Sequence, residues 1–301
     1  MKSTMVRRVA LSIALTAALA GVTACNSSDS SGGSGKAGHK GTTRVSPIAA
    51  LRSAERSTDG ADSAKVESTT TMGTLMSMKA DGVMGWADGL TGTMTITYTG
   101  GTLADTMRQT GSTSMQARYL PDAYYARMSD KFAAQSGGKH WIRYGYDDLA
   151  KFGGSSGAYL KDQMQNTTPN QSVKLLLASG DVEKVGTETV RGRSATHYSG
   201  TVDVADLASK SSNLSASQLA DLKKQLTAAG VTTEKVDIWV DGDDLLVKKV
   251  EKGELASGTM TSTAYYSDYG TKVSAEEPPT ADTADFKDLL KAQGATGGTT
   301  S

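Results

Sequence analysis

Several segments of the chain beyond residue 62 alternate between apolar and polar side chains with a period of two. In Thr91–Thr99, Met94, Ile96 and Tyr98 alternate with threonines, and Lys65–Met76 has a similar pattern. Alternation of this kind is typical of antiparallel strands with one buried face. The same criteria predict further strands, giving roughly ten or eleven in all: Ser114–Tyr119, Ala123–Met128, His140–Tyr146, Val182–Val190, Ser194–Val202, Lys235–Val240, Leu245–Leu255 and Thr259–Tyr269.

Turn and helix signals separate these runs. Asp81-Gly82 and Asp88-Gly89 fall between alternating segments, where hairpins need residues that tolerate positive φ, so both are predicted turns. Pro47 to about Arg56 is a predicted helix that begins with proline.

Three further helices are predicted nearer the C-terminus. Thr168-Pro169-Asn170-Gln171 has the pattern of a capping box ahead of an apolar run that Gly180 ends, and Ser215-Ala216-Ser217-Gln218 repeats it. The third spans about Ala284–Gln293. Many strands with a few one-faced helices indicate the α+β class, a curved antiparallel sheet with helices covering its concave side. No boundary interrupts the pattern, so residues 47–293 form one predicted domain.

The N-terminus has the layout of a secretory signal. Lys2, Arg7 and Arg8 precede the apolar run Val9–Ala20, and small residues follow as far as Cys25. The apolar run is far shorter than the ~20 residues that span a bilayer. Residues 1–24 are therefore predicted to be a signal peptide. Residues 26–46 are rich in Ser and Gly and form a predicted flexible linker, and residues 294–301 form a similar tail.

The composition of the chain argues against several classes of function and site. Lys and Arg together number 32, as do Asp and Glu, so no cationic surplus favours binding to nucleic acid. One Cys and three His are too few for a disulfide framework or a Cys/His zinc site, and no cofactor is predicted. The share of apolar residues is only 38%, with three Phe and three Trp, but there are 12 Met.

Catalytic patterns are weak. Gly153-Gly154-Ser155-Ser156-Gly157 matches G-x-S-x-G but lacks the preceding buried strand that a nucleophile elbow needs. Ser136-Gly137-Gly138-Lys139 matches Ser-x-x-Lys, yet its glycines disfavour the helix that would align the two side chains. His197 lies in an alternating strand, and Asp241-Gly242-Asp243-Asp244 fits a turn better than a calcium loop. The chain is therefore not predicted to be an enzyme.

Several short motifs carry a family resemblance: Lys139-His140-Trp141-Ile142, Gly180–Gly186, Thr196–Gly200, Val236–Asp241 and Tyr266–Gly270, all after Val22-Thr23-Ala24-Cys25. In this order they resemble the actinobacterial lipoproteins of the LppX/LprG type, relatives of the LolA/LolB lipoprotein carriers. The likeness covers about Leu51 to Asp285. Val22 stands where the lipoprotein signal usually has Leu. The resemblance implies cleavage before Cys25, diacylation of its sulfur, and a half-open β-barrel whose concave face holds acyl chains.

The expected function is that of a lipoprotein anchored through acylated Cys25 to the extracytoplasmic face of the cell membrane, which binds or carries a lipid or glycolipid. Methionine side chains are unbranched and adaptable, which suits variable acyl chains, although such residues also serve as ordinary core. The residues predicted to line the cavity are Met72, Met84, Met94, Ile96 and Ile238. An alternative is a non-enzymatic interaction module with a filled core, which meets another protein of the cell envelope.

Overall fold

The computed structural model describes residues 46–152, 168–203, 233–255 and 258–296, together with the single residues 158, 161, 164, 165 and 220. The predicted signal peptide, Cys25, nearly all of the linker, the G-x-S-x-G segment, almost all of the predicted helix after Ser215 and the end of the C-terminal tail lie outside these residues.

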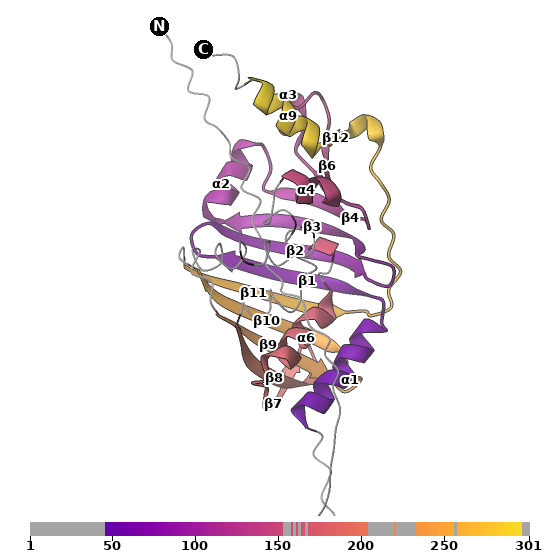
Figure 1. The fold of residues 1–301 in the computed structure, drawn as a ribbon, viewed down its shortest axis with the longest axis vertical. Coiled ribbons are helices and arrows are strands. Elements are labelled where there is room, and N and C mark those ends of the chain that lie inside the picture. The colour runs from indigo at the N-terminus through magenta and orange to yellow at the C-terminus, as the bar shows by residue number, and fades with distance from the viewer. Residues whose placement is uncertain are drawn as a thin grey trace, which may run out of the picture.

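The described strands form one open sheet of twelve, in the order β12-β6-β5-β4-β3-β2-β1-β11-β10-β9-β8-β7 (Figure 1). All neighbouring strands are antiparallel except β12 and β6. The predicted curved antiparallel sheet of the α+β class is confirmed. Its strands are β1 (Ser63–Met72), β2 (Met76–Gly85), β3 (Thr91–Gly100), β4 (Ser114–Tyr119), β5 (Ala123–Arg127), β6 (Trp141–Gly145), β7 (Glu183–Val190), β8 (Arg193–Asp203), β9 (Thr233–Asp241), β10 (Leu246–Leu255), β11 (Gly258–Ser267) and β12 (Thr283–Asp285).

Two predictions near the first hairpins are wrong. The predicted strand Lys65–Met76 is divided, because the chain turns after Met72 and Met76 begins β2. The predicted turn at Asp81-Gly82 lies inside β2 instead, where Gly82 pairs with Val66 on one side and Met94 on the other. The turn at Asp88-Gly89 is confirmed, with a φ of 94° at Gly89.

The helices are α1 (Pro47–Asp59), α2 (Gly101–Gln109), α3 (Asp130–Gln135), α4 (Tyr146–Phe152), α6 (Pro169–Ser179) and α9 (Phe286–Thr296), with a short 3₁₀ turn at Thr280–Asp282. Helices α2, α3 and α4 were not predicted. Helix α6 begins at the predicted proline and ends at Gly180, whose φ is 71°. The predicted capping box is absent, because the Thr168 hydroxyl donates to Asn170 Oδ1, and the Asn170 amide in turn donates to Asp59 of α1. Helix α9 starts two residues after the predicted position and continues to Thr296, past the predicted boundary at 293.

The helices gather at the two ends of the sheet (Figure 1). Helices α1 and α6 pack against β8–β10, where Leu51, Val173 and Leu176 contact Val236 and Ile238 in a cluster in which each is fully buried. At the other end, α4 and α9 pack against β6, with Leu149 and Phe286 close to Ile142 and Tyr144.

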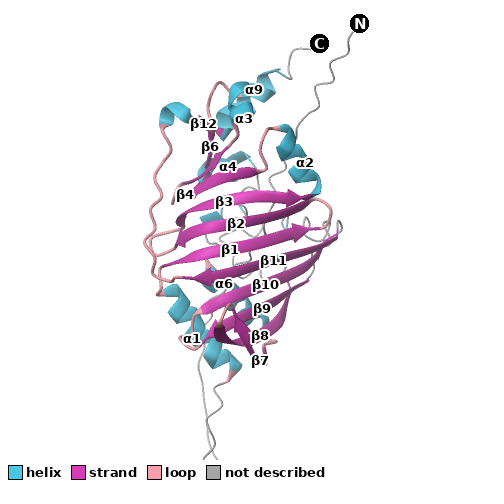
Figure 2. Cartoon of the chain, turned by 180° about the vertical axis from the view of Figure 1, so that it is seen from behind, coloured by secondary structure: helices cyan, strands magenta, loops and turns pink. Residues whose placement is uncertain are grey.

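The segment between β11 and β12 crosses the ends of the intervening strands along one side of the sheet (Figure 2). Two hydrogen bonds fix it: Ser63 Oγ donates to the Thr271 carbonyl at 2.6 Å, and Arg118 Nη1 donates to the Glu276 carbonyl at 2.8 Å. None of the helices in the described ranges is long and apolar enough to cross a membrane.

Candidate functional site

One face of the sheet is apolar from β8 to β6, and we call it the apolar face. It carries the side chain of Val66 in β1 and those of every second residue of that strand counted from Val66. It also carries the side chains of the neighbouring strands that the register pairs with these residues. All five residues predicted to line a cavity lie on this face: Met72, Met84, Met94, Ile96 and Ile238. Helices α6, α4 and α9 cover its two ends.

The middle of the apolar face brings three of the predicted residues together. Met94 and Ile96, each 8% exposed, form a cluster with Ala80 and Ala117, and Met84 packs against it as a half-buried residue. The other half-buried members of this cluster are Val66, Met78, Tyr98, Met115, Tyr119 and Tyr124. Small residues thus lie at the base of a surface of flexible and aromatic side chains.

Glycines position the two methionines. A Cβ on Gly82 would lie 2.9 Å from the Met94 sulfur, and a Cβ on Gly92 would lie 2.6 Å from the Met84 sulfur. Each methionine therefore lies over a glycine of the neighbouring strand, in space that any other residue would fill. Sequence reasoning assigned Gly82 to a turn and missed this role.

The remaining two predicted residues lie elsewhere on the apolar face. Met72 packs with Met76 and Met260 in an adjoining cluster that shares Met78 and Tyr98 with the central one. Ile238 is fully buried in the cluster beneath α1 and α6, so helix side chains already fill the space above it.

A row of tyrosines extends the apolar face toward α9, and sequence reasoning missed most of it. The ring centroids of Tyr119 and Tyr124 are 5.0 Å apart, those of Tyr124 and Tyr144 are 5.7 Å apart, and Phe286 lies 4.8 Å from Tyr144. Burial raises the pKa of Tyr119 to about 12 and that of Tyr124 well above its ordinary value. The phenol groups of Tyr119 and Tyr124 are thus desolvated, although each residue as a whole is half-buried.

The opposite face of the sheet carries polar side chains around a small apolar cluster that contains Trp239. His197 stacks on Trp239 with centroids 4.2 Å apart, while its two ring nitrogens lie 3.1 Å from Glu188 Oε1 and 2.9 Å from Asp237 Oδ1. Lys248 Nζ lies 3.7 Å from the centroid of the Trp239 ring. These contacts occupy both nitrogens of His197 and fit a structural role.

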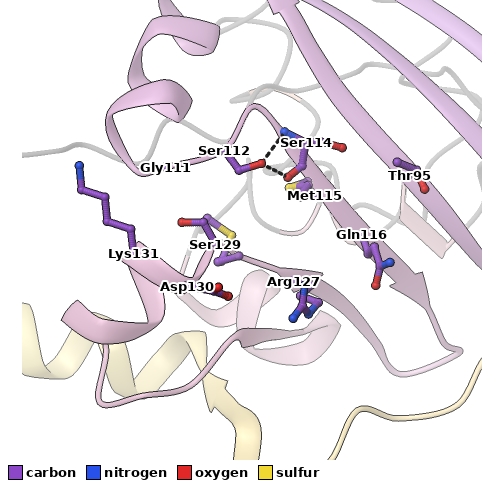
Figure 3. Close-up of a pocket in the computed structure, with 11 residues that line it drawn as sticks. Thr95, Gly111, Ser112, Ser114, Met115, Gln116, Arg127, Ser129, Asp130 and Lys131 are labelled. Carbon is purple, nitrogen blue, oxygen red and sulfur yellow. Dashed lines mark hydrogen bonds between the residues drawn. The ribbon is translucent and has the colours of Figure 1, made fainter.

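A polar pocket of about 440 Å³ lies beside β3–β5 and the start of α3 (Figure 3). Two serine hydroxyls of the pocket form hydrogen bonds with the backbone. Ser112 Oγ donates to the Ser114 carbonyl at 2.8 Å, and Ser129 Oγ accepts from the Phe132 amide at 3.2 Å. Asp130 pairs with His140 at 3.4 Å. Hydroxyls, Arg127 and Lys131 line the pocket, and no nucleophile lies in it beside a general base.

Two other motifs with catalytic or metal-binding patterns, Ser136–Lys139 and Asp241–Asp244, are part of the scaffold. Gly137 and Gly138 have φ of 72° and 79° after the end of α3, so no helix aligns Ser136 with Lys139. The predicted turn at Asp241–Asp244 is confirmed, because Asp241 Oδ1 accepts from the amides of Asp243 and Leu245 at 3.1 and 3.0 Å. No group of three or more metal-ligating side chains occurs in the part of the chain that the structure describes.

Comparison with known proteins identifies relatives of this chain in Streptomyces. The chain is 52% identical to the Streptomyces coelicolor protein named "Putative lipoprotein SCO4650", over 98% of this chain and 100% of the relative. It is 62% identical to an "Uncharacterized 31.2 kDa protein" of Streptomyces griseus, over 86% of this chain and 85% of that one. No protein-family model matches.

Two solved structures are also similar. Mycobacterium tuberculosis lipoprotein LppX is 17% identical with a TM-score of 0.47, over 76% of this chain and 98% of that one. LprF from Mycobacterium bovis is 15% identical with a TM-score of 0.47, over 77% and 96%. The lipoprotein resemblance that the sequence motifs indicate is confirmed by the Streptomyces coelicolor relative.

Proposed function

The chain belongs to the same family as these two Streptomyces proteins, and from that premise we propose that it is a membrane-anchored lipoprotein that binds or carries a lipid or glycolipid on the apolar face of its sheet. Acylated Cys25 would hold it at the extracytoplasmic face of the membrane, since two acyl chains are what stable anchoring requires. In this proposal the protein performs no chemistry on its cargo.

The observation that supports the proposal is the middle of the apolar face. Half-buried methionines and tyrosines there surround a base of small residues, between the helices that cover the two ends. Thioethers adapt their shape to a flexible chain, and tyrosine combines a large apolar ring with a polar tip. Each CH₂ group of an acyl chain that leaves water contributes about 0.8 kcal/mol, so a long chain can bind without a charged contact.

We expect Met84→Trp to weaken lipid binding by about tenfold or more. The indole would occupy space used by at least two CH₂ groups, worth about 1.6 kcal/mol, which is roughly a tenfold change in affinity. Met84 suits this test better than Met94, because Met84 is half-buried whereas Met94 is only 8% exposed within the cluster. The measurement is a titration of the mature protein with a phospholipid that carries a pyrene-labelled acyl chain.

Val83→Trp is the matched control. Val83 precedes Met84 in β2 and is also half-buried, but its side chain lies on the opposite face of the sheet. It should leave lipid binding within about twofold of wild type. Equal binding by both variants, or a loss of stability in Met84→Trp without loss of binding, would count against the carrier and for an interaction module with a filled core.

A further inference from the structure

A group of ionisable side chains lies buried on the apolar face, beneath the first turn of α6. We call it the buried charge cluster: Glu234 of β9, Lys249 and Glu251 of β10, and Tyr266 of β11, which are 3%, 7%, 2% and 8% exposed. Register explains how two charged residues of β10 come to face inward. The pairing of β10 with β9 shifts between Leu246 and Lys248, which turns Lys249 and Glu251 toward the face that Leu246 shares.

The cluster holds two carboxyl groups but only one ammonium group. Lys249 Nζ donates to both oxygens of the Glu251 carboxylate at 2.9 and 3.0 Å, and Ser172 Oγ donates to one of them at 2.7 Å. Glu251 thus forms an ion pair with Lys249, the one cation of the cluster. Among the residues that the structure describes, Glu234 has no cation of its own, and its Oε1 atom is buried without a hydrogen-bond partner.

The surroundings of Glu234 explain its protonation. Burial, reinforced by the negative charge of Glu251 and opposed in part by Lys249, raises the pKa of Glu234 to about 8. At neutral pH it is therefore mostly a neutral acid. A buried polar atom without a partner is destabilising, so a purely structural cluster gains nothing from this oxygen.

The residue beside Glu234 on β10 has no side chain. It is Gly253, and a Cβ built there would be in ordinary van der Waals contact with Met260 Cε and the Thr233 carbonyl, both at 3.8 Å, so the glycine leaves room of about the size of a methyl or ammonium group. Met260 and Met72 continue the apolar face from this point toward the centre of the sheet. The unpartnered carboxyl thus lies at one end of a row of methionines.

We propose that the buried charge cluster is the subsite for an ammonium group on the bound lipid, an inference that rests on the proposed function. A ligand ammonium beside Glu234 would displace the proton of that carboxyl, pair with the resulting carboxylate and donate a hydrogen bond to its unpartnered oxygen. The apolar face would hold the chain of the same molecule.

The test uses three amphiphiles with one and the same C12 chain: dodecylamine, dodecanol and dodecanoate. Each is titrated by calorimetry at pH 7 into the mature chain in which Cys25 is replaced by Ser. We expect the amine to bind about tenfold or more tightly than the alcohol, the scale of one charge-assisted hydrogen bond, and dodecanoate to bind no better than the alcohol. In Glu234→Gln the amine should fall to within about twofold of the alcohol, whose own affinity stays unchanged and reports that the variant is folded.

Glu254→Gln is the control, because Glu254 lies on the neighbouring strand β10 but is exposed on the opposite face. It should keep the preference for the amine. A wild-type protein that binds amine and alcohol equally, or a preference that survives in Glu234→Gln, would overturn the ammonium subsite and leave the carrier function standing. Failure of all three amphiphiles to bind would overturn the proposed function itself, and this inference with it.

Proton release provides a second readout. An ammonium beside Glu234 lowers the pKa of that carboxyl, so binding of the amine at pH 7 should expel about one proton, measured from the difference in binding heat between two buffers of unlike ionisation enthalpy. Dodecanol should expel none, and neither should the amine with Glu234→Gln. Amine binding without proton release in the wild type would contradict the assignment.

Discussion

Gly82→Ala is expected to lower the free energy of unfolding by about 3 kcal/mol or more. A Cβ at this position would lie 2.0 Å from the Thr93 carbonyl oxygen and 2.8 Å from Met94 Cα. Both are backbone atoms of β3, so no side-chain rotation relieves the overlap and the two strands must move apart. Urea denaturation followed by circular dichroism measures the effect.

Gly242→Ala is the matched control for this substitution. Gly242 lies in the turn after β9, and a Cβ built on it meets no atom within 4 Å. Its free energy of unfolding should change by no more than about 0.5 kcal/mol. Equal stability of the two variants would mean that β2 and β3 do not approach each other as closely as the structure has them.

Cys25→Ser is expected to abolish lipid anchoring. Serine provides no thiol for the diacylglyceryl group, so the two acyl chains of the proposed anchor would be lost. Metabolic labelling with a radioactive fatty acid should give no labelled band, and the protein should move from the membrane fraction to the medium. Asn26→Ser, one residue beyond the acceptor, should keep both the label and the membrane location. A Cys25→Ser protein that stays firmly on the membrane after removal of its signal would refute anchoring through this residue.

The strands were predictable because their buried face repeats every two residues. Ser114–Tyr119 and Leu245–Leu255 match β4 and β10 to within one residue. The hairpin at Gly73–Leu75 and the inward position of Gly82 were not predictable. Glycine is required at position 82 because a backbone atom of a different strand, 11 residues later in the chain, lies too close for a Cβ. A tight turn and a close approach of two strands both favour glycine, and the sequence alone does not show which of the two a given glycine serves.

The candidate site was predictable only within single strands. Alternation placed Met94 and Ile96 on one face, but joining them to Tyr119, Tyr124 and Tyr144 requires the register between strands. A register shift in β10 also reverses the expected pattern, because Lys249 turns inward while Val250 turns to the opposite face. The cover that α6 places over Ile238 is likewise a tertiary contact that no local pattern records.

The most direct test of the central claim is native mass spectrometry of the mature chain with Cys25→Ser, produced in bacteria and purified without detergent. If the apolar face holds an acyl chain, the protein should carry an added mass that matches a cellular lipid. The added mass should persist in Val83→Trp and be lost in Met84→Trp. A spectrum that contains only the bare protein in all three would contradict lipid binding and favour a core filled by the protein's own side chains.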